Sequence, residues 1–216
     1  MDYFMTVLLP MIGGLAVTMG IFLITFIVSI PLGFGFTLMT RSRFKIVNLF
    51  AEAFIYVLRG TPLMLQLLFV YFGMPLLPVI GPFLTFNRFP AACIAFSLNY
   101  AAYFAEIFRG GLLAVDVGQY EASKVLGLSR FQTMVRVIIP QMIRVSLPSI
   151  TNETITLLKD TALVTIIGVA EVLHYAKAAV NRDATPFAYL VAGLLYLLIN
   201  FIITLVFKKL EEKFDF

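Results

Sequence analysis

The sequence predicts an all-α membrane protein with about five transmembrane helices. Hydrophobic residues make up 61% of the 216 residues and charged residues only 13%, whereas soluble domains carry about 25% charged residues. The mean hydropathy is +0.97, and the apolar residues gather in runs near the length of about 20 that crosses a bilayer. We therefore expect residues 1–216 to form one membrane domain with lipid, not nucleic acid, as its surroundings.

Five apolar runs set the expected spans. They cover residues 11–39, 62–77, 89–114, 146–173 and 187–207. The first, third and fourth exceed one perpendicular crossing, so they should tilt, and Pro31 should kink the first. The second is short, begins at Pro62 and has an amphipathic lead-in from Ile46. The N-terminus lacks the positive region of a cleaved signal peptide, so the first run should remain as a span.

Lysine and arginine predict the orientation of these spans. On one side lie Arg41, Arg43, Lys45, Lys124, Arg130, Arg136, Arg144, Lys208, Lys209 and Lys213. On the other side lie Arg88, Lys177 and Arg182. Positively charged loops stay in the cytoplasm. The chain should therefore have its N-terminus outside and its C-terminus inside, which agrees with an odd number of spans.

Residues 116–139, between the third and fourth spans, predict a hairpin of two short amphipathic helices in the cytoplasm. Asp116 and Ser129 are suitable N-caps, and each is followed three residues later by a glutamine that can reach back. Gly127 stands between the helices, where a helix stop needs a positive φ. One apolar face of the first helix consists of Ala122, Val125 and Leu126. The pattern leaves two roles open: resting on lipid headgroups, or docking a soluble partner.

The hairpin also carries a family resemblance. EASKVLGLSRFQTMVRVIIPQMIRVSLPSI, residues 121–150, resembles the EAA loop of permease subunits from bacterial ATP-binding-cassette (ABC) importers. Glu121, Ala122, Gly127 and Pro140 occupy positions of that motif, and Ser123 stands where the motif has a second alanine.

Three further segments are similar to the branch of these permeases that takes up polar amino acids such as histidine, arginine, lysine and glutamine. They are LRGTPLMLQLLFVYFG (58–73), AAYFAEIFRGGLLAVDVGQYEASKVLGLS (101–129) and LLKDTALVTIIGVAE (157–171). The resemblance runs from about residue 13 to the tail, with the blocks in the family's order.

This resemblance implies a multi-pass subunit of the bacterial cytoplasmic (inner) membrane that pairs with a second permease subunit, identical or not. A separate ATPase subunit, which binds ATP and Mg, would dock on the hairpin and drive alternating access. An extracytoplasmic binding protein would deliver the amino acid. The docking residues would be Glu121, Ala122, Ser123, Gly127 and Leu128. The sequence agrees with a separate ATPase, because it has no G-x-x-x-x-G-K-[ST] motif to cradle phosphates.

Ionisable residues inside spans indicate candidate substrate contacts, because each costs about 2.5–3.5 kcal/mol to insert. Glu153 and Asp160 are seven residues apart, so they share one helix face at a spacing of about 10 Å. Two carboxylates suit the cationic groups of arginine, lysine or histidine, and we expect a basic substrate. The structural alternatives are that Asp160 bonds Thr161 or a helix end, and that Lys159 pairs with another span.

Polar residues in the second and third spans complete the predicted substrate site. Asn99 and Tyr103 share a face of the third span and can bond either the substrate or a neighbouring helix. Glu106 continues that face, but Arg109 follows it by three residues, which favours a local ion pair. Thr61 and Gln66 are the candidates in the second span.

No catalytic or metal site is predicted, because no nucleophile–base pair or metal-ligand spacing is visible. His174 and Cys93 are interpreted as packing residues. One alternative function stays open: a stand-alone channel or ion-gradient transporter for a small polar solute. In it, Glu153, Lys159 and Asp160 would serve an ion or proton path. The capped hairpin argues against this alternative, since a lone transporter needs no docking element.

Overall fold

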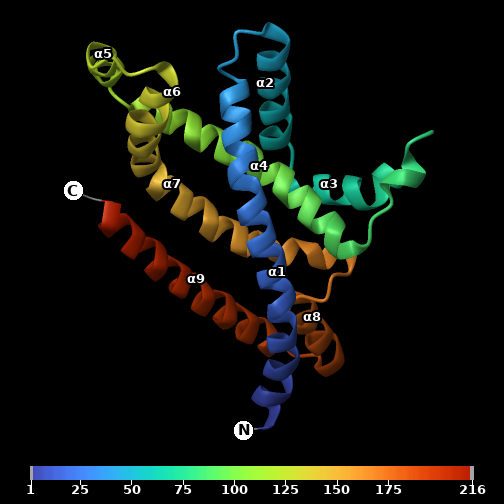
Figure 1. Ribbon diagram of the computed structural model, residues 1–216. Coiled ribbons are helices and arrows are strands. Elements are labelled where there is room, and N and C mark those ends of the chain that lie inside the picture. The colour runs from blue at the N-terminus through green and yellow to red at the C-terminus, as the bar shows by residue number, and fades with distance from the viewer. Residues whose placement is uncertain (1, 215–216) are drawn as a thin grey trace.

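The computed structural model describes residues 2–214, which are mostly helical and contain no β-strand (Figure 1). The α-helices are α1 (Asp2–Met39), α2 (Lys45–Gly60), α3 (Leu63–Leu68), α4 (Arg88–Ala114), α5 (Val117–Val125), α6 (Arg130–Thr133), α7 (Ile139–Asp160), α8 (Val172–Asp183) and α9 (Phe187–Phe214). Short 3-10 or π-helical segments lie at Phe69–Gly73, Met74–Leu76, Gly81–Leu84, Met134–Ile138 and Thr161–Ile167. The predicted all-α fold is confirmed.

Helices α1 and α4 form the centre of the molecule. In Figure 1, α1 runs the length of the fold and α4 crosses it. Gly33 allows the close approach, because a Cβ there would lie 2.7 Å from the Cβ of Phe104 and 2.9 Å from the carbonyl oxygen of Ala101. The Thr37 hydroxyl donates a hydrogen bond to the Ala105 carbonyl at 2.9 Å. α4 is largely buried by its neighbours, whereas α9 leaves most of its apolar surface exposed, as a lipid-facing helix would.

Three helices are long and apolar enough to cross a membrane, and a broken pair can supply a fourth. The three lie at Tyr3–Met39, Arg88–Ala114 and Phe187–Lys213, and the broken pair is α2 with Leu63–Leu76. The predicted end of the first span at residue 39, the third span, and the start of the fifth at residue 187 agree with these helices. Helix α7 is not apolar enough to count among these spans. It carries the charged residues Arg144, Glu153, Lys159 and Asp160.

The prediction that residues 62–77 cross the membrane by themselves was wrong, although their start agrees with the start of α3: Leu63–Leu76 qualifies as a span only together with α2. α2 ends at Gly60, and the chain turns by 105° before α3 begins. Thr61 is extended, with φ −119° and ψ 146°, as expected for a residue before proline. Pro62 has no backbone N–H to continue the helix. The segment after it is α-helical only to Leu68 and then becomes π-helical and 3-10.

The prediction of a fourth span at 146–173 and of a separate second hairpin helix was also wrong. The helix that starts at Arg130 continues through a π-helical segment and α7 to Asp160. The π turn precedes Pro140, whose missing N–H disrupts regular α-helical bonding. Residues Thr161–Ile167 form a 3-10 helix, which ends at Gly168, with φ +74°. Glu171, fully buried, then caps α8 by accepting from the backbone N–H groups of residues 173 and 174.

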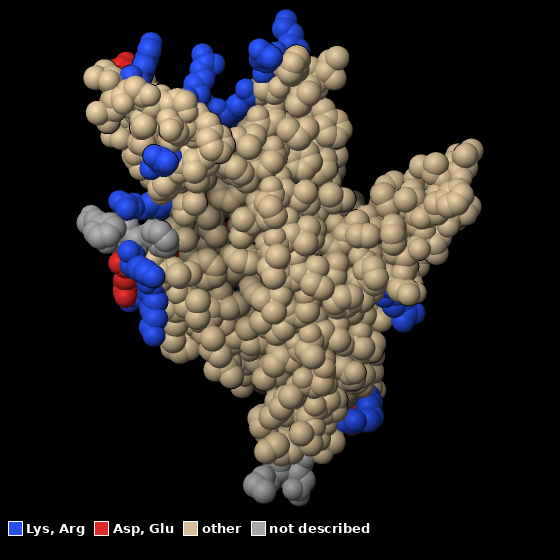
Figure 2. All heavy atoms as spheres, in the orientation of Figure 1, with Lys and Arg blue, Asp and Glu red and all other residues tan. Residues whose placement is uncertain are grey.

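Charge is distributed unevenly over the surface. Figure 2 shows lysine and arginine side chains gathered over the end that carries α5, α6 and the α1–α2 turn, and along the side near the C-terminus. Fewer lie toward the opposite end, where the N-terminus is placed. This distribution is the one that the predicted orientation expects.

Candidate functional site

A cavity of about 530 Å³ lies where the α2–α3 break meets α4 and α7. Its lining residues are Arg59, Gly60, Thr61, Pro62, Leu63, Met64, Asn99, Tyr100, Tyr103, Glu153, Thr156, Asp160 and Leu163. Five of the six predicted substrate contacts are among them: Thr61, Asn99, Tyr103, Glu153 and Asp160. The structure therefore brings together side chains from three predicted spans.

Helix α7 supplies the acidic wall of this cavity. Glu153 and Asp160 are both half-buried and line it from one helix face. The buried Tyr100 hydroxyl on α4 donates to Oδ2 of Asp160 at 2.7 Å. Thr161, the alternative partner considered for Asp160, donates its hydroxyl to the Leu158 carbonyl instead. Sequence reasoning missed Tyr100, since its contact depends on how α4 crosses α7.

The α2–α3 break supplies the opposite wall, and two amides hold it. In a regular helix the Leu58 carbonyl would accept from the N–H of residue 62, which proline lacks. Gln66 Nε2 and Asn99 Nδ2 donate to that carbonyl at 2.8 and 3.1 Å. Asn99 also donates to Gln66 Oε1 at 3.0 Å. Gln66 does not line the cavity. Its hydrogen bonds to Asn99 and to the Leu58 carbonyl hold Asn99 and the α2–α3 break in place.

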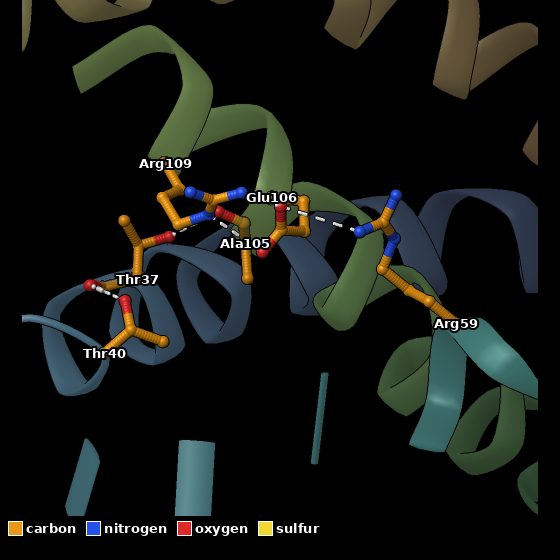
Figure 3. Close-up of polar contacts among 6 residues, drawn as sticks. All are labelled: Thr37, Thr40, Arg59, Ala105, Glu106 and Arg109. Carbon is orange, nitrogen blue, oxygen red and sulfur yellow. Dashed lines mark hydrogen bonds and ion pairs between the residues drawn. The ribbon is translucent and has the colours of Figure 1, made fainter. Parts of the chain in front are cut away.

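Three charged side chains meet where α2 passes α4 (Figure 3). Arg109 donates to both carboxylate oxygens of Glu106, at 2.6 and 3.0 Å, so the predicted local ion pair is confirmed. A guanidinium nitrogen of Arg59 lies 3.6 Å from Glu106 Oε2. The Arg59 guanidinium also lies 5.3 Å from the ring centre of Tyr103. Arg59 stands in the last turn of α2.

A second cavity, of about 480 Å³, adjoins this cluster. It is lined by Thr40, Arg41, Glu52, Ile55, Tyr56, Arg59, Glu106, Arg109 and Leu113. Arg59 is the residue that both cavities share. Because Arg41 belongs to the loop predicted to be cytoplasmic, this second cavity lies toward the predicted cytoplasmic side.

The hairpin has most of its predicted capping. Asp116 accepts from the Gly118 N–H at 2.6 Å, and Ser129 with Gln132 forms a reciprocal capping box. Gly127 has φ +73°, as a helix stop requires. Gln119 does not reach back to Asp116; its side-chain oxygen accepts from Gln141 instead.

The hairpin presents its predicted apolar face outward. Val125 is 87% exposed and Leu126 78% exposed, and Glu121, Ala122 and Gly127 are exposed beside them. Of the other predicted docking residues, Leu128 is partly buried and Ser123 is buried, with its hydroxyl donating to the Gln119 carbonyl. Ser123 therefore faces the fold, and the outward surface is formed by its neighbours.

Comparison with known proteins gives consistent matches over nearly the whole chain. Residues 29–215 match the family described as binding-protein-dependent transport system inner membrane component. The chain is 40% identical to the arginine transport system permease protein ArtQ of Bacillus subtilis (strain 168), over 93% of this chain and 90% of that protein. It is 36% identical to the L-cystine transport system permease protein TcyB of the same organism, over 94% and 86%. A crystal structure of an amino acid ABC transporter with histidines superimposes with a TM-score of 0.85 at 33% identity, covering 94% of both chains.

Proposed function

Because the chain belongs to the family of inner membrane components of binding-protein-dependent transport systems, we propose that it is the permease subunit through which an ABC importer moves basic amino acids into the cytoplasm. Its place is the inner membrane, as a multi-pass component. The similar proteins are amino-acid permeases, but their names differ in substrate: one is named for arginine and another for cystine. The evidence for a basic substrate is therefore the charge of the side chains that line the cavity.

The observation that carries the proposal is the pair of carboxylates in one cavity. Glu153 and Asp160 both line it, beside the hydroxyl of Tyr100. A charged carboxylate inside a membrane protein needs a partner or water. A basic amino acid brings two cationic groups, the α-ammonium and the side chain, whereas glutamine brings one. A basic substrate is thus the class that satisfies both carboxylates.

The exposed hairpin surface supports docking of a separate ATPase. Val125, Leu126 and Phe131 are apolar and at least 76% exposed, and such surface in a cytoplasmic segment usually marks an interaction site. ATP and Mg would be held by that ATPase, and this chain would be the part that moves. An extracytoplasmic binding protein would supply the amino acid on the other side.

The exposed polar face of α7 supports a second permease subunit. Asn152 and Lys159 are exposed on this helix, although their neighbours toward the fold are buried. Facing lipid would be costly for them, so a protein surface is the better environment. That surface would belong to a second copy or to a related permease chain. Alternating access of the pair would then connect the two cavities in turn with the two sides of the membrane.

Competitive uptake tests the proposed substrate class. Proteoliposomes containing the permease, its ATPase and its binding protein are given labelled arginine with unlabelled lysine, histidine or glutamine as competitors. We expect lysine or histidine to compete better than glutamine. Transport of glutamine without transport of arginine would contradict the proposal. Solute flux under an ion gradient without any ATPase would favour the stand-alone transporter instead.

A further inference from the structure

We infer that Arg59 binds the α-carboxylate of the transported amino acid, and that Glu106 is a positioning residue that holds Arg59 at the cavity. This inference rests on the proposed function and adds to it the orientation of the substrate. It starts from the fact that Arg59 is the cationic residue in the lining of the acidic cavity.

The guanidinium of Arg59 has unused N–H hydrogen-bond donors. Within residues 2–214 it makes one ion pair, at 3.6 Å, and one contact with the Tyr103 ring, but no hydrogen bond. Its side chain is 41% exposed. A guanidinium carries five N–H donors in a planar fork that matches a carboxylate. An incoming carboxylate therefore finds a cation that is held in place and has unused hydrogen-bond donors.

Glu106 is already occupied by another partner. Arg109 donates to both of its oxygens, at 2.6 and 3.0 Å, so one carboxylate serves two arginines (Figure 3). Of these two arginines, Arg59 makes the longer contact, so its interaction with Glu106 is the weaker one. Glu106 lines the second cavity and not the acidic one. Its influence on a substrate would thus pass through Arg59.

The charges in the cavity mirror those of a basic amino acid. The lining carries one cation, Arg59, and two carboxylates, Glu153 and Asp160. Arginine, lysine and protonated histidine carry one carboxylate and two cations. Binding in the matching orientation pairs every charge, whereas a neutral side chain would leave a carboxylate in the cavity unpaired. Arg59 thereby fixes which end of the substrate lies toward the second cavity.

The test compares two ligands that differ only in the carboxylate. Arginine and arginine methyl ester are titrated calorimetrically into the detergent-solubilised complex of permease and ATPase, without the binding protein. We expect the wild-type complex to bind arginine about tenfold or more tightly than the ester, as for a lost hydrogen bond to a charged group. Arg59→Gln should weaken arginine by that factor, whereas the ester, which has no carboxylate and is repelled by the Arg59 cation, should not bind more weakly. Arg59→Lys should give an intermediate ratio.

Two further variants separate positioning from charge. Glu106→Gln should weaken arginine more than the ester, with a smaller effect than Arg59→Gln. Lys177→Gln is the matched control, because it removes an exposed cation on α8 that is not in the lining; the ratio of the two affinities should stay at its wild-type value. Co-elution of each variant with the ATPase shows that it is folded.

The possible failures are distinguishable. If Arg59→Gln weakens arginine and the ester equally, or weakens neither, Arg59 is not the carboxylate partner, although the cavity can still be the substrate site. If the wild-type complex binds no arginine, lysine or histidine, the cavity is not a site for a basic substrate. That result contradicts both the proposed substrate class and the role of Arg59.

Discussion

At the scale of single residues, Glu153 and Asp160 decide the chemistry of the cavity. Both come from one face of α7, and the structure places both in the lining of one space. Their seven-residue spacing predicted that shared face, because side-chain direction within a helix follows from its period alone. The roles of Tyr100 and Arg59 in the cavity could not be predicted from spacing. Their partners stand on other helices, and no spacing within one helix reveals a contact between two.

Replacing the carboxylates should impair transport of basic amino acids. We expect Glu153→Gln or Asp160→Asn to raise the apparent KM for arginine uptake by about tenfold or more, since each removes a charged hydrogen-bond acceptor. Initial rates in proteoliposomes measure this. Glu212→Gln is the matched control, because Glu212 is an exposed carboxylate that lines neither cavity. Unchanged arginine uptake by Glu153→Gln would remove Glu153 from the site.

Gln66 should behave as a structural residue and not as a substrate contact. Its amide donates to the Leu58 carbonyl that Pro62 cannot satisfy. Gln66→Met keeps the volume but removes the donor, and should lower the stability of the detergent-solubilised protein by about 1–3 kcal/mol. A lower apparent Tm, with the order of substrate preference kept, is the expected result. Leu65→Met, at an exposed neighbour, is the control. An altered preference at unchanged Tm would show that Gln66 touches substrate.

At the scale of elements, apolar runs located the long helices but not the sharp turn before α3 or the early end of α7. The third span and the start of the fifth were predicted within a residue, because hydropathy alone defines long apolar helices. The turn at Thr61 and Pro62 and the stop at Gly168 depend on backbone groups, which hydropathy does not record. The buried carboxylate of Glu171 was likewise counted within an apolar run, although it caps α8. These breaks matter, because one of them forms a wall of the cavity.

The hairpin should fail as a docking element when its outward face is charged. Val125→Asp places a carboxylate at a position that is 87% exposed, so the fold should tolerate it. We expect the variant to remain in the membrane but to bind the ATPase about thirtyfold or more weakly, as for an interface hot spot. Co-purification and uptake measure this. Ile46→Asp, at another exposed apolar position near the predicted cytoplasmic side, should leave both intact. Retained ATPase binding by Val125→Asp would exclude this face.

The contact between α1 and α4 should depend on glycine at position 33. A Cβ there would lie 2.7 Å from Phe104 and 2.9 Å from a backbone oxygen, so neither helix can accommodate it without moving. We expect Gly33→Val to cost about 1–3 kcal/mol through overpacking and to lower the apparent Tm in detergent. Gly35→Val, where nothing lies within 4 Å of an added Cβ, is the control. Equal stability of the two variants would contradict this packing.

At the scale of the whole molecule, this chain is one component of a transport system. It carries a cavity with two carboxylates and one arginine, an exposed apolar face on its hairpin, and no phosphate-binding motif in its sequence. Family membership was recognisable from several motif blocks in the right order. The substrate class was not, because related permeases with similar blocks carry names for different amino acids.

The exposed polar residues of α7 lead to a prediction about assembly. Because Asn152 and Lys159 need a protein or aqueous environment, the purified complex should contain two permease chains. Light scattering coupled to size-exclusion chromatography measures the mass of that complex. A complex with a single permease chain would leave this face to lipid and contradict the prediction.

ATP-dependent uptake tests the central claim most directly. Proteoliposomes are prepared with the permease, its ATPase and its binding protein, with ATP and Mg on the ATPase side, and labelled arginine is added on the other side. We predict that arginine accumulates only when ATP is present, and that Glu121→Arg abolishes accumulation while the subunit stays in the membrane. Accumulation without ATP, or undiminished accumulation by Glu121→Arg, would contradict the account.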